Sequence, residues 1–126
     1  MLERLNAPGA FHAAPYCHAC RAGNFLFVTG QISVDPDSGD YVLGDIETET
    51  RRVMDNLLIV LEHAGFAPAD VVSARAFLTD FPNEYETFNR VYTEYMGDHL
   101  PARTTVGVTA LAAGARVEVD FVAYRD

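Results

Sequence analysis

Hydrophobic and polar positions alternate in two segments near the end of the chain. Residues 103–109 alternate valine with polar or small residues, and residues 116–121 alternate apolar with charged residues. The small-residue segment 111–115, which contains a glycine, separates them. Alternation with β-branched residues on both sides of a turn is typical of an antiparallel hairpin. The pattern therefore predicts a hairpin in which Arg103 and Asp120 lie roughly opposite each other.

Two other segments repeat their apolar residues at helical spacing. From Asp45 to Ala64 an apolar stripe faces a side covered by charged residues, with Asp45 suited to cap the start and Gly65 to end the helix. A second helix is predicted from about Glu84 to Met96, with Asn83 as its cap. Its aromatic stripe indicates a packing face.

Strands are predicted at residues 16–22, 25–29 and 71–79, with a turn at Gly23-Asn24 and a minor strand at 41–43. Because each helix leads from one strand to another, part of the five- or six-stranded sheet must be parallel. Two helices can cover only one face of such a sheet. We therefore expect a single domain over residues 1–126 and a homo-oligomer, with a neighbouring subunit burying the other face.

The charge composition excludes or disfavours several classes of function. The formal net charge is −9, and all nine basic residues are arginine. Without lysine there is no Schiff-base lysine, pyridoxal-phosphate anchor or P-loop lysine, and a nucleic-acid partner is disfavoured. The chain has no apolar run long enough for a membrane span and no secretory signal at its start, so we expect a cytoplasmic protein that binds small molecules.

Few motifs for catalysis are present. Cys17 and Cys20 form a C-x-x-C, but on a strand their side chains would point to opposite faces, so we interpret them as two reduced thiols rather than a redox pair or metal chelate. No nucleophile elbow, metal-binding signature or phosphate loop occurs, and we expect no cofactor and no metal.

The candidate chemistry that remains is the pair of Arg103 and Asp120. An arginine can hold a carboxylate ligand by two parallel hydrogen bonds, and a nearby acid can orient water or move a proton. The alternative is a cross-strand ion pair on a solvated face. Hydrogen-bonding groups expected to assist the pair are Tyr16, Thr29, Asn89 and Thr105.

Six segments, in this order and spacing, resemble the RidA/YjgF family of enamine/imine deaminases over almost the whole chain. They are Ala14-Pro15-Tyr16, AGNFLFVTGQISVDPDSGD, DIETETRRVMDNLLIVLEHAG, DVVSARAFLTD, FNRVYTEY and PARTTVGV with VEVDFVAY. The resemblance implies a chorismate-mutase-like α+β fold, with two helices on one face of a six-stranded mixed sheet. It also implies a homotrimer whose sheets face inward and whose three sites lie between subunits.

The resemblance also implies an activity: hydrolysis of reactive 2-aminoacrylate or 2-imino acid intermediates to 2-keto acids and ammonia. Arg103 falls on the family's carboxylate-binding arginine, Tyr16, Thr29 and Asn89 on positions that line its cleft, and Gly30 in its T/S-G-Q turn. Two positions depart from the family pattern. Thr105 replaces a common cysteine, and Asp120 stands where active members commonly carry glutamate, which predicts altered specificity or weaker activity.

Two alternatives remain from the sequence. One is a non-catalytic trimer that binds small keto acids or regulates a partner. The other is a pathway-specific deaminase of a larger enamine.

Overall fold

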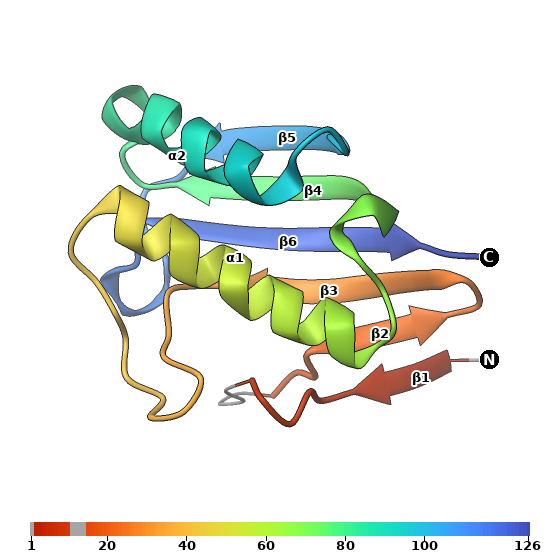
Figure 1. The fold of residues 1–126 in the computed structure, drawn as a ribbon. Helices are drawn as coiled ribbons and strands as arrows, with labels where there is room; N and C mark the ends of the chain where they lie inside the picture. The colour runs from red at the N-terminus through yellow and green to blue at the C-terminus, as the bar shows by residue number, and fades with distance from the viewer. Residues whose placement is uncertain (1, 11–14) are drawn as a thin grey trace.

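A six-stranded mixed sheet forms one layer of the fold and two helices form the other (Figure 1). The structure is a computed structural model and describes residues 2–10 and 15–126. Ala14, part of the segment that resembles the deaminase family, lies outside the described residues. The strand order is β1-β2-β3-β6-β4-β5. The strands are β1 (Leu2–Leu5), β2 (Ala19–Ala22), β3 (Phe25–Gln31), β4 (Val71–Leu78), β5 (Ala102–Gly107) and β6 (Val117–Tyr124).

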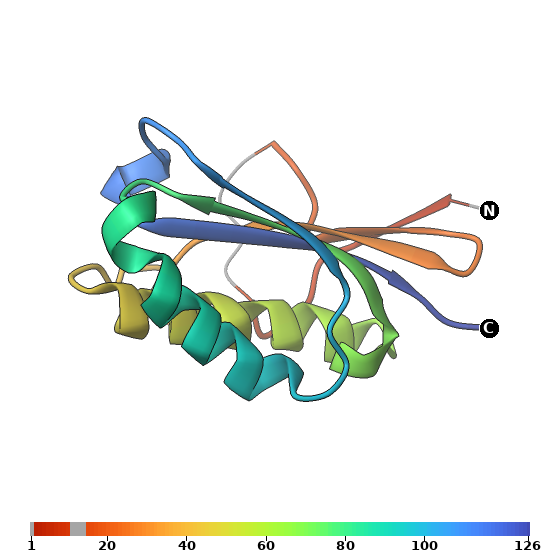
Figure 2. The same ribbon diagram turned by 90° about the horizontal axis from the view of Figure 1, so that it is seen from above.

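Both long helices, α1 (Ile46–His63) and α2 (Phe81–Met96), lie on the same side of the sheet (Figure 2). Asp45 caps α1 as predicted, because its carboxylate accepts a hydrogen bond of 2.8 Å from the Thr48 amide. The apolar stripes of both helices pack against the alternate, buried residues of the strands. The predicted α+β architecture with two helices on one face of a six-stranded mixed sheet is confirmed. No helix in the described ranges has the length and hydrophobicity to cross a membrane.

The predicted C-terminal hairpin is wrong. β4 lies between β5 and β6, parallel to β5 and antiparallel to β6. Arg103 is paired with Ala74, whereas Asp120 is paired with Arg75. Alternation identifies a strand but carries no information about its partner. The connection 108–116 is long enough to span the roughly 10 Å across one intervening strand.

Smaller differences arise where local signals compete. α2 begins at Phe81 with Asp80 at its N-cap, rather than at Glu84 after Asn83. The first predicted strand, residues 16–22, begins only at Ala19 as the short strand β2, and an edge strand, β1, precedes it. Two short 3₁₀ helices, η1 (Pro68–Asp70) and η2 (Ala112–Gly114), lead into β4 and β6.

The face of the sheet away from the helices carries exposed apolar side chains, and we call it the open face. Phe25, Phe27, Val106 and Tyr124 are each between 38% and 48% exposed on it. The strands alternate, so their other side chains are buried under the helices. An apolar surface of this kind is typical of an interface.

Candidate functional site

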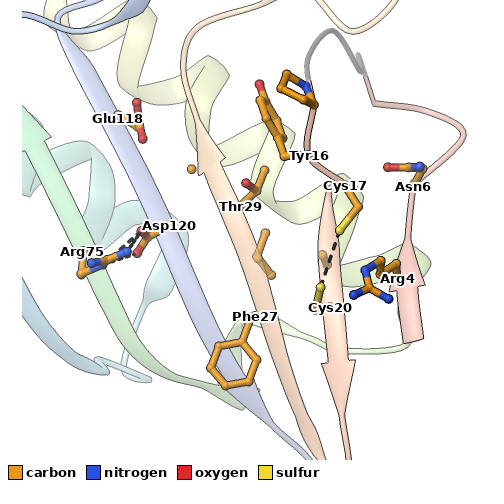
Figure 3. Close-up of a pocket in the computed structure, with 14 residues that line it drawn as sticks. Arg4, Asn6, Tyr16, Cys17, Cys20, Phe27, Thr29, Arg75, Glu118 and Asp120 are labelled. Carbon is orange, nitrogen blue, oxygen red and sulfur yellow. Dashed lines mark hydrogen bonds and ion pairs between the residues drawn. The ribbon is translucent and has the colours of Figure 1, made fainter. Parts of the chain in front are cut away.

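A cavity of about 870 Å³ lies on the open face and is shown in Figure 3. The segment 15–20 and strand β3 form one side of it, and β6 with β4 forms the other. Because successive strand residues point to opposite faces, Thr29 from β3 and Glu118 and Asp120 from β6 all face this cavity. Polar groups on an otherwise apolar sheet face mark this place as the candidate site.

Gly30 and Glu118 are in close contact within the cavity. A Cβ atom on residue 30 would overlap the Glu118 carboxylate oxygen Oε2 and lie 3.0 Å from its Cδ. Any larger residue at position 30 would therefore have to displace the Glu118 carboxylate. The glycine allows a carboxylate to lie directly over the backbone of β3.

Glu118 is half-buried, and its pKa is raised. Burial is the largest cause, the negative charge of Asp120 adds to it, and the Arg75 guanidinium opposes both. Asp120 itself is held by Arg75, whose Nη2 donates a hydrogen bond of 2.7 Å and whose Nε donates a second of 3.1 Å to Oδ2 (Figure 3). A carboxyl with a raised pKa is suited to accept and return protons near neutral pH. Glu118, rather than Asp120, is thus the acid–base candidate in the cavity.

Tyr16 and Thr29, two of the candidate site residues from the sequence, line the same cavity. Tyr16 is 50% exposed, so its side chain is open to a ligand. Thr29 is fixed by its backbone amide, which donates a hydrogen bond of 2.9 Å to the carbonyl of His18. These two residues place hydroxyl groups across the cavity from the carboxylates.

Arg103 lies elsewhere, on the helix side of the edge strand β5. Its guanidinium carbon is 4.8 Å from the centre of the Tyr92 ring and 5.3 Å from that of Phe88. Its Nη2 donates a hydrogen bond of 2.7 Å to Asn89 Oδ1 and a longer one of 3.5 Å to the Tyr85 hydroxyl. Within residues 2–10 and 15–126 it forms no ion pair, and its Nε and Nη1 donate no hydrogen bond. The guanidinium is therefore held in one orientation, and its Nε and Nη1 can still donate hydrogen bonds to an anion.

The predicted site residues therefore fall into two groups. Tyr16, Thr29, Gly30 and Asp120 line the cavity of the open face, whereas Asn89 and Arg103 line a second cavity of about 250 Å³ near the end of α2. Thr105 lines neither of them. Its hydroxyl is buried on β5 without a hydrogen-bond partner among the described residues. The expected convergence of Arg103 and Asp120 is wrong for a single chain, because their side chains lie on opposite faces of the sheet.

The sequence interpretation missed Glu118 and Arg75. Glu118 alternates with Asp120 in the same strand, so the pattern already places both on one face, but it does not say which of them faces Gly30. Arg75 could not be recognised before β4 was known to pair with β6. Since the last strand does carry a glutamate in the cavity, the weakening expected from a shorter Asp120 side chain no longer follows. No three His, Cys, Asp or Glu residues in the described part of the chain are grouped to hold a metal ion.

The chain is similar in sequence and in fold to known proteins. A family model described as Endoribonuclease L-PSP matches residues 5–125. A RutC family protein from Pyrococcus horikoshii is 41% identical over 96% of this chain and 94% of its own. The 2-iminobutanoate/2-iminopropanoate deaminase of Homo sapiens is 33% identical over 98% of this chain and 88% of its own.

Two solved structures show the same fold. YyfA from Yersinia pestis, described as a Rid family protein, has a TM-score of 0.94 with 35% identity and covers 99% of this chain and 100% of its own. Escherichia coli TdcF, solved with bound serine, has a TM-score of 0.89 with 26% identity, over 98% of each chain. From the family model and these relatives, the chain belongs to the endoribonuclease L-PSP family, which is the RutC/RidA family that its sequence resembles.

Proposed function

We propose that this chain is an imine deaminase that hydrolyses 2-imino acids and their 2-aminoacrylate-type enamine forms to 2-keto acids and ammonia. The observation that carries the proposal is the unpaired guanidinium of Arg103. It is held in place by Asn89 and aromatic rings, but no carboxylate of the described residues pairs with it, although the net charge is −9. Such a group suits a carboxylate ligand. The human relative named as a deaminase and TdcF, solved with a bound amino acid, support the same ligand class.

The site would be shared between chains of a homotrimer. Arg103 and Glu118 lie on opposite faces of one sheet, so a single chain cannot place both on one small substrate. Arg103 is on the edge strand β5, where a neighbouring copy can approach. The apolar open face supplies a surface for that contact. Arg103 of one chain would then face the Glu118 cavity of the next.

In this arrangement each group has a defined role. Arg103 binds the substrate carboxylate through two parallel hydrogen bonds, with Asn89 and Thr105 beside it as further polar groups. Glu118 takes a proton from the attacking water and returns it to the departing nitrogen, which leaves as ammonia. Tyr16 and Thr29 hydrogen-bond the water or the amine, and Gly30 leaves room for the Glu118 carboxylate. Because free imines already hydrolyse in water, positioning supplies most of the required acceleration.

The test follows the decay of 2-iminopropanoate generated in situ by an amino-acid oxidase. The purified protein should accelerate the decay, and Arg103→Ala should remove about 10²-fold of that acceleration. Arg103→Lys should recover only part of it, because the ammonium lacks the planar fork. Arg90→Ala, on the solvent side of α2, is the matched control and should behave like the unchanged protein.

Two results would contradict the proposal in different ways. An unchanged decay rate with the purified protein would refute deaminase activity. Calorimetric binding of 2-oxobutanoate in the same preparation would then favour a non-catalytic keto-acid-binding trimer. Equal acceleration by Arg103→Ala and the unchanged protein would refute only the role of the arginine.

A deaminase of a larger enamine is the second candidate. In the proposed trimer a neighbouring copy would form part of the wall of this cavity of about 870 Å³, so that copy also sets the length of the substrate. Decay rates measured for imines of increasing side-chain length would distinguish the two, since a larger natural substrate predicts rates that rise with length.

Cleavage of RNA, which the family description names, receives little support from this chain. It has no lysine and a net charge of −9, so it lacks the clustered positive charge that phosphate backbones require. Cytoplasmic localisation stays a prediction from the sequence.

A further inference from the structure

Cys17 and Cys20 are the only two cysteines of the chain, and both line the cavity of the open face. Their Sγ atoms lie 3.6 Å apart and form a hydrogen bond, drawn as a dashed line in Figure 3. Both thiols are free and partly exposed. The proposed deaminase mechanism uses neither of them.

The local backbone explains why the two thiols meet, and it corrects the prediction that they point to opposite faces. Strand β2 begins at Ala19, so Cys17 precedes it and the alternation of a strand does not apply. The two residues between the cysteines, His18 and Ala19, are each only 1% exposed. With those side chains turned into the protein, the two sulfurs are left on the cavity side.

His18 fixes this segment in place. Its backbone amide donates a hydrogen bond of 3.0 Å to the Leu5 carbonyl, and its Nδ1 accepts one of 2.9 Å from the Ala7 amide. Both contacts tie the segment to the chain around β1. Since the anchor lies directly between the cysteines, it restricts how far the two sulfurs can separate, which raises their effective concentration toward each other.

We propose that Cys17 and Cys20 are a redox-active dithiol that closes to an intramolecular disulfide on the cavity wall. The sulfurs must approach from 3.6 Å to about 2.0 Å, the length of an S–S bond. The inference does not depend on the proposed function.

A hydroperoxide or a small-molecule disulfide is the oxidant. With hydrogen peroxide, one thiolate attacks an oxygen, the O–O bond breaks, and a sulfenic acid forms while water is released. The second thiol then attacks the oxidised sulfur, and a second water leaves. Two thiols and one peroxide thus become one disulfide and two waters.

The Cys17–Cys20 hydrogen bond is also the largest cause of a raised pKa at Cys20; burial and the charge interaction with Cys17 add to it, and Arg4 opposes them. Either sulfur can be the donor of this bond, and the raised pKa keeps Cys20 in its thiol form to higher pH. Because the thiolate is the attacking group in disulfide formation, closure of this pair should become faster as the pH rises.

The test measures the intact mass of the full chain after reduction, removal of the reductant and treatment with hydrogen peroxide or oxidised glutathione. Closure of the disulfide lowers the mass by about 2 Da and takes the thiol count from two to zero, and dithiothreitol reverses both. The proposal would be overturned if the products were glutathione adducts, oxygen adducts or chain-to-chain disulfides, without the loss of about 2 Da from the single chain.

Two controls separate the folded geometry from mere closeness in sequence. Cys17→Ser and Cys20→Ser each leave one thiol, so neither can lose about 2 Da, and each should take up glutathione or oxygen instead. The equilibrium between the dithiol and the disulfide is then measured in a glutathione buffer for the unchanged protein, once folded and once unfolded in urea. The folded state should favour the disulfide about tenfold or more over the unfolded chain. An equal or weaker preference in the folded state would show that the fold does not promote closure.

Discussion

At the residue scale, the cavity depends on one glycine and on three charged side chains. Gly30 leaves room for the Glu118 carboxylate, and Arg75 holds Asp120 two residues further along β6. The charges are coupled, because Asp120 raises the pKa of Glu118 and Arg75 lowers it. Substitutions here are expected to change the chemistry more than the stability.

Gly30→Ala should reduce imine hydrolysis by about 10²-fold, because the new methyl group displaces the Glu118 carboxylate by about 1 Å. Thermal unfolding should change little, since the atoms in contact belong to a side chain. Gly9→Ala is the matched control. A Cβ there meets Ile59 at an ordinary 3.5 Å, away from the cavity. Equal rates for the two variants would show that the Gly30–Glu118 contact is not needed.

Asp120→Asn should move the acid limb of the pH–rate profile to lower pH. Loss of the negative charge removes one cause of the raised pKa of Glu118, and the released Arg75 guanidinium lowers that pKa further. Glu118 then stays ionised, and able to act as a base, at more acidic pH. Asp126→Asn, at the end of the chain, should leave the profile unchanged. A shift to higher pH in Asp120→Asn would contradict this coupling.

At the element scale, a buried carboxylate joins α1 to the segment that enters β6. Glu49 on α1 is almost completely buried and accepts hydrogen bonds from the amides of Arg116, at 2.8 Å, and Gly44, at 3.2 Å. The Arg116 guanidinium is 3.7 Å from the same carboxylate. These contacts set how β6, and with it Glu118, is positioned relative to the helix layer.

Glu49→Ala should destabilise the protein by about 2–4 kcal/mol, because it leaves two backbone amides without their acceptor and removes one of the two carboxylates paired with the Arg116 guanidinium. Glu49→Gln keeps one side-chain oxygen and should lose less. Urea unfolding of both variants measures the difference. Equal stability of Glu49→Ala and the unchanged protein would mean that solvent replaces these contacts at no cost.

At the scale of the whole molecule, the open face and the edge strand β5 together indicate assembly. Phe25, Phe27 and Tyr124 are partly exposed on the open face of the sheet, whereas the helices bury the opposite face of its central strands. Arg103 at the edge forms no ion pair with a carboxylate of residues 2–10 or 15–126. Another copy packed against this surface would bury the apolar side chains and bring its own groups close to Arg103.

Val122→Asp should therefore lower the mass in solution from three times the 13.8 kDa chain mass to that of a single chain. Val122 is on the open face of the middle strand β6, so a charge there is tolerated in a monomer but is costly within an interface. Light scattering coupled to gel filtration gives the mass. Ala69→Asp, in the exposed turn before β4, should keep the assembly. A monomeric unchanged protein would refute the trimer and the shared site.

The sequence by itself determined the local elements, because caps, turn residues and apolar periodicity act over a few residues. It predicted the Asp45 cap, the Gly23-Asn24 turn and the apolar faces of both helices. The resemblance of its motifs also identified the family.

Only the tertiary structure decided which strands are neighbours, since strand pairing joins residues far apart in the chain. The insertion of β4 between β5 and β6 separates Arg103 from Asp120, and it places Arg75 where it forms an ion pair with Asp120. The same long-range packing brings Glu118 over Gly30. None of these contacts has a signature in local pattern, because each depends on where the rest of the sheet lies.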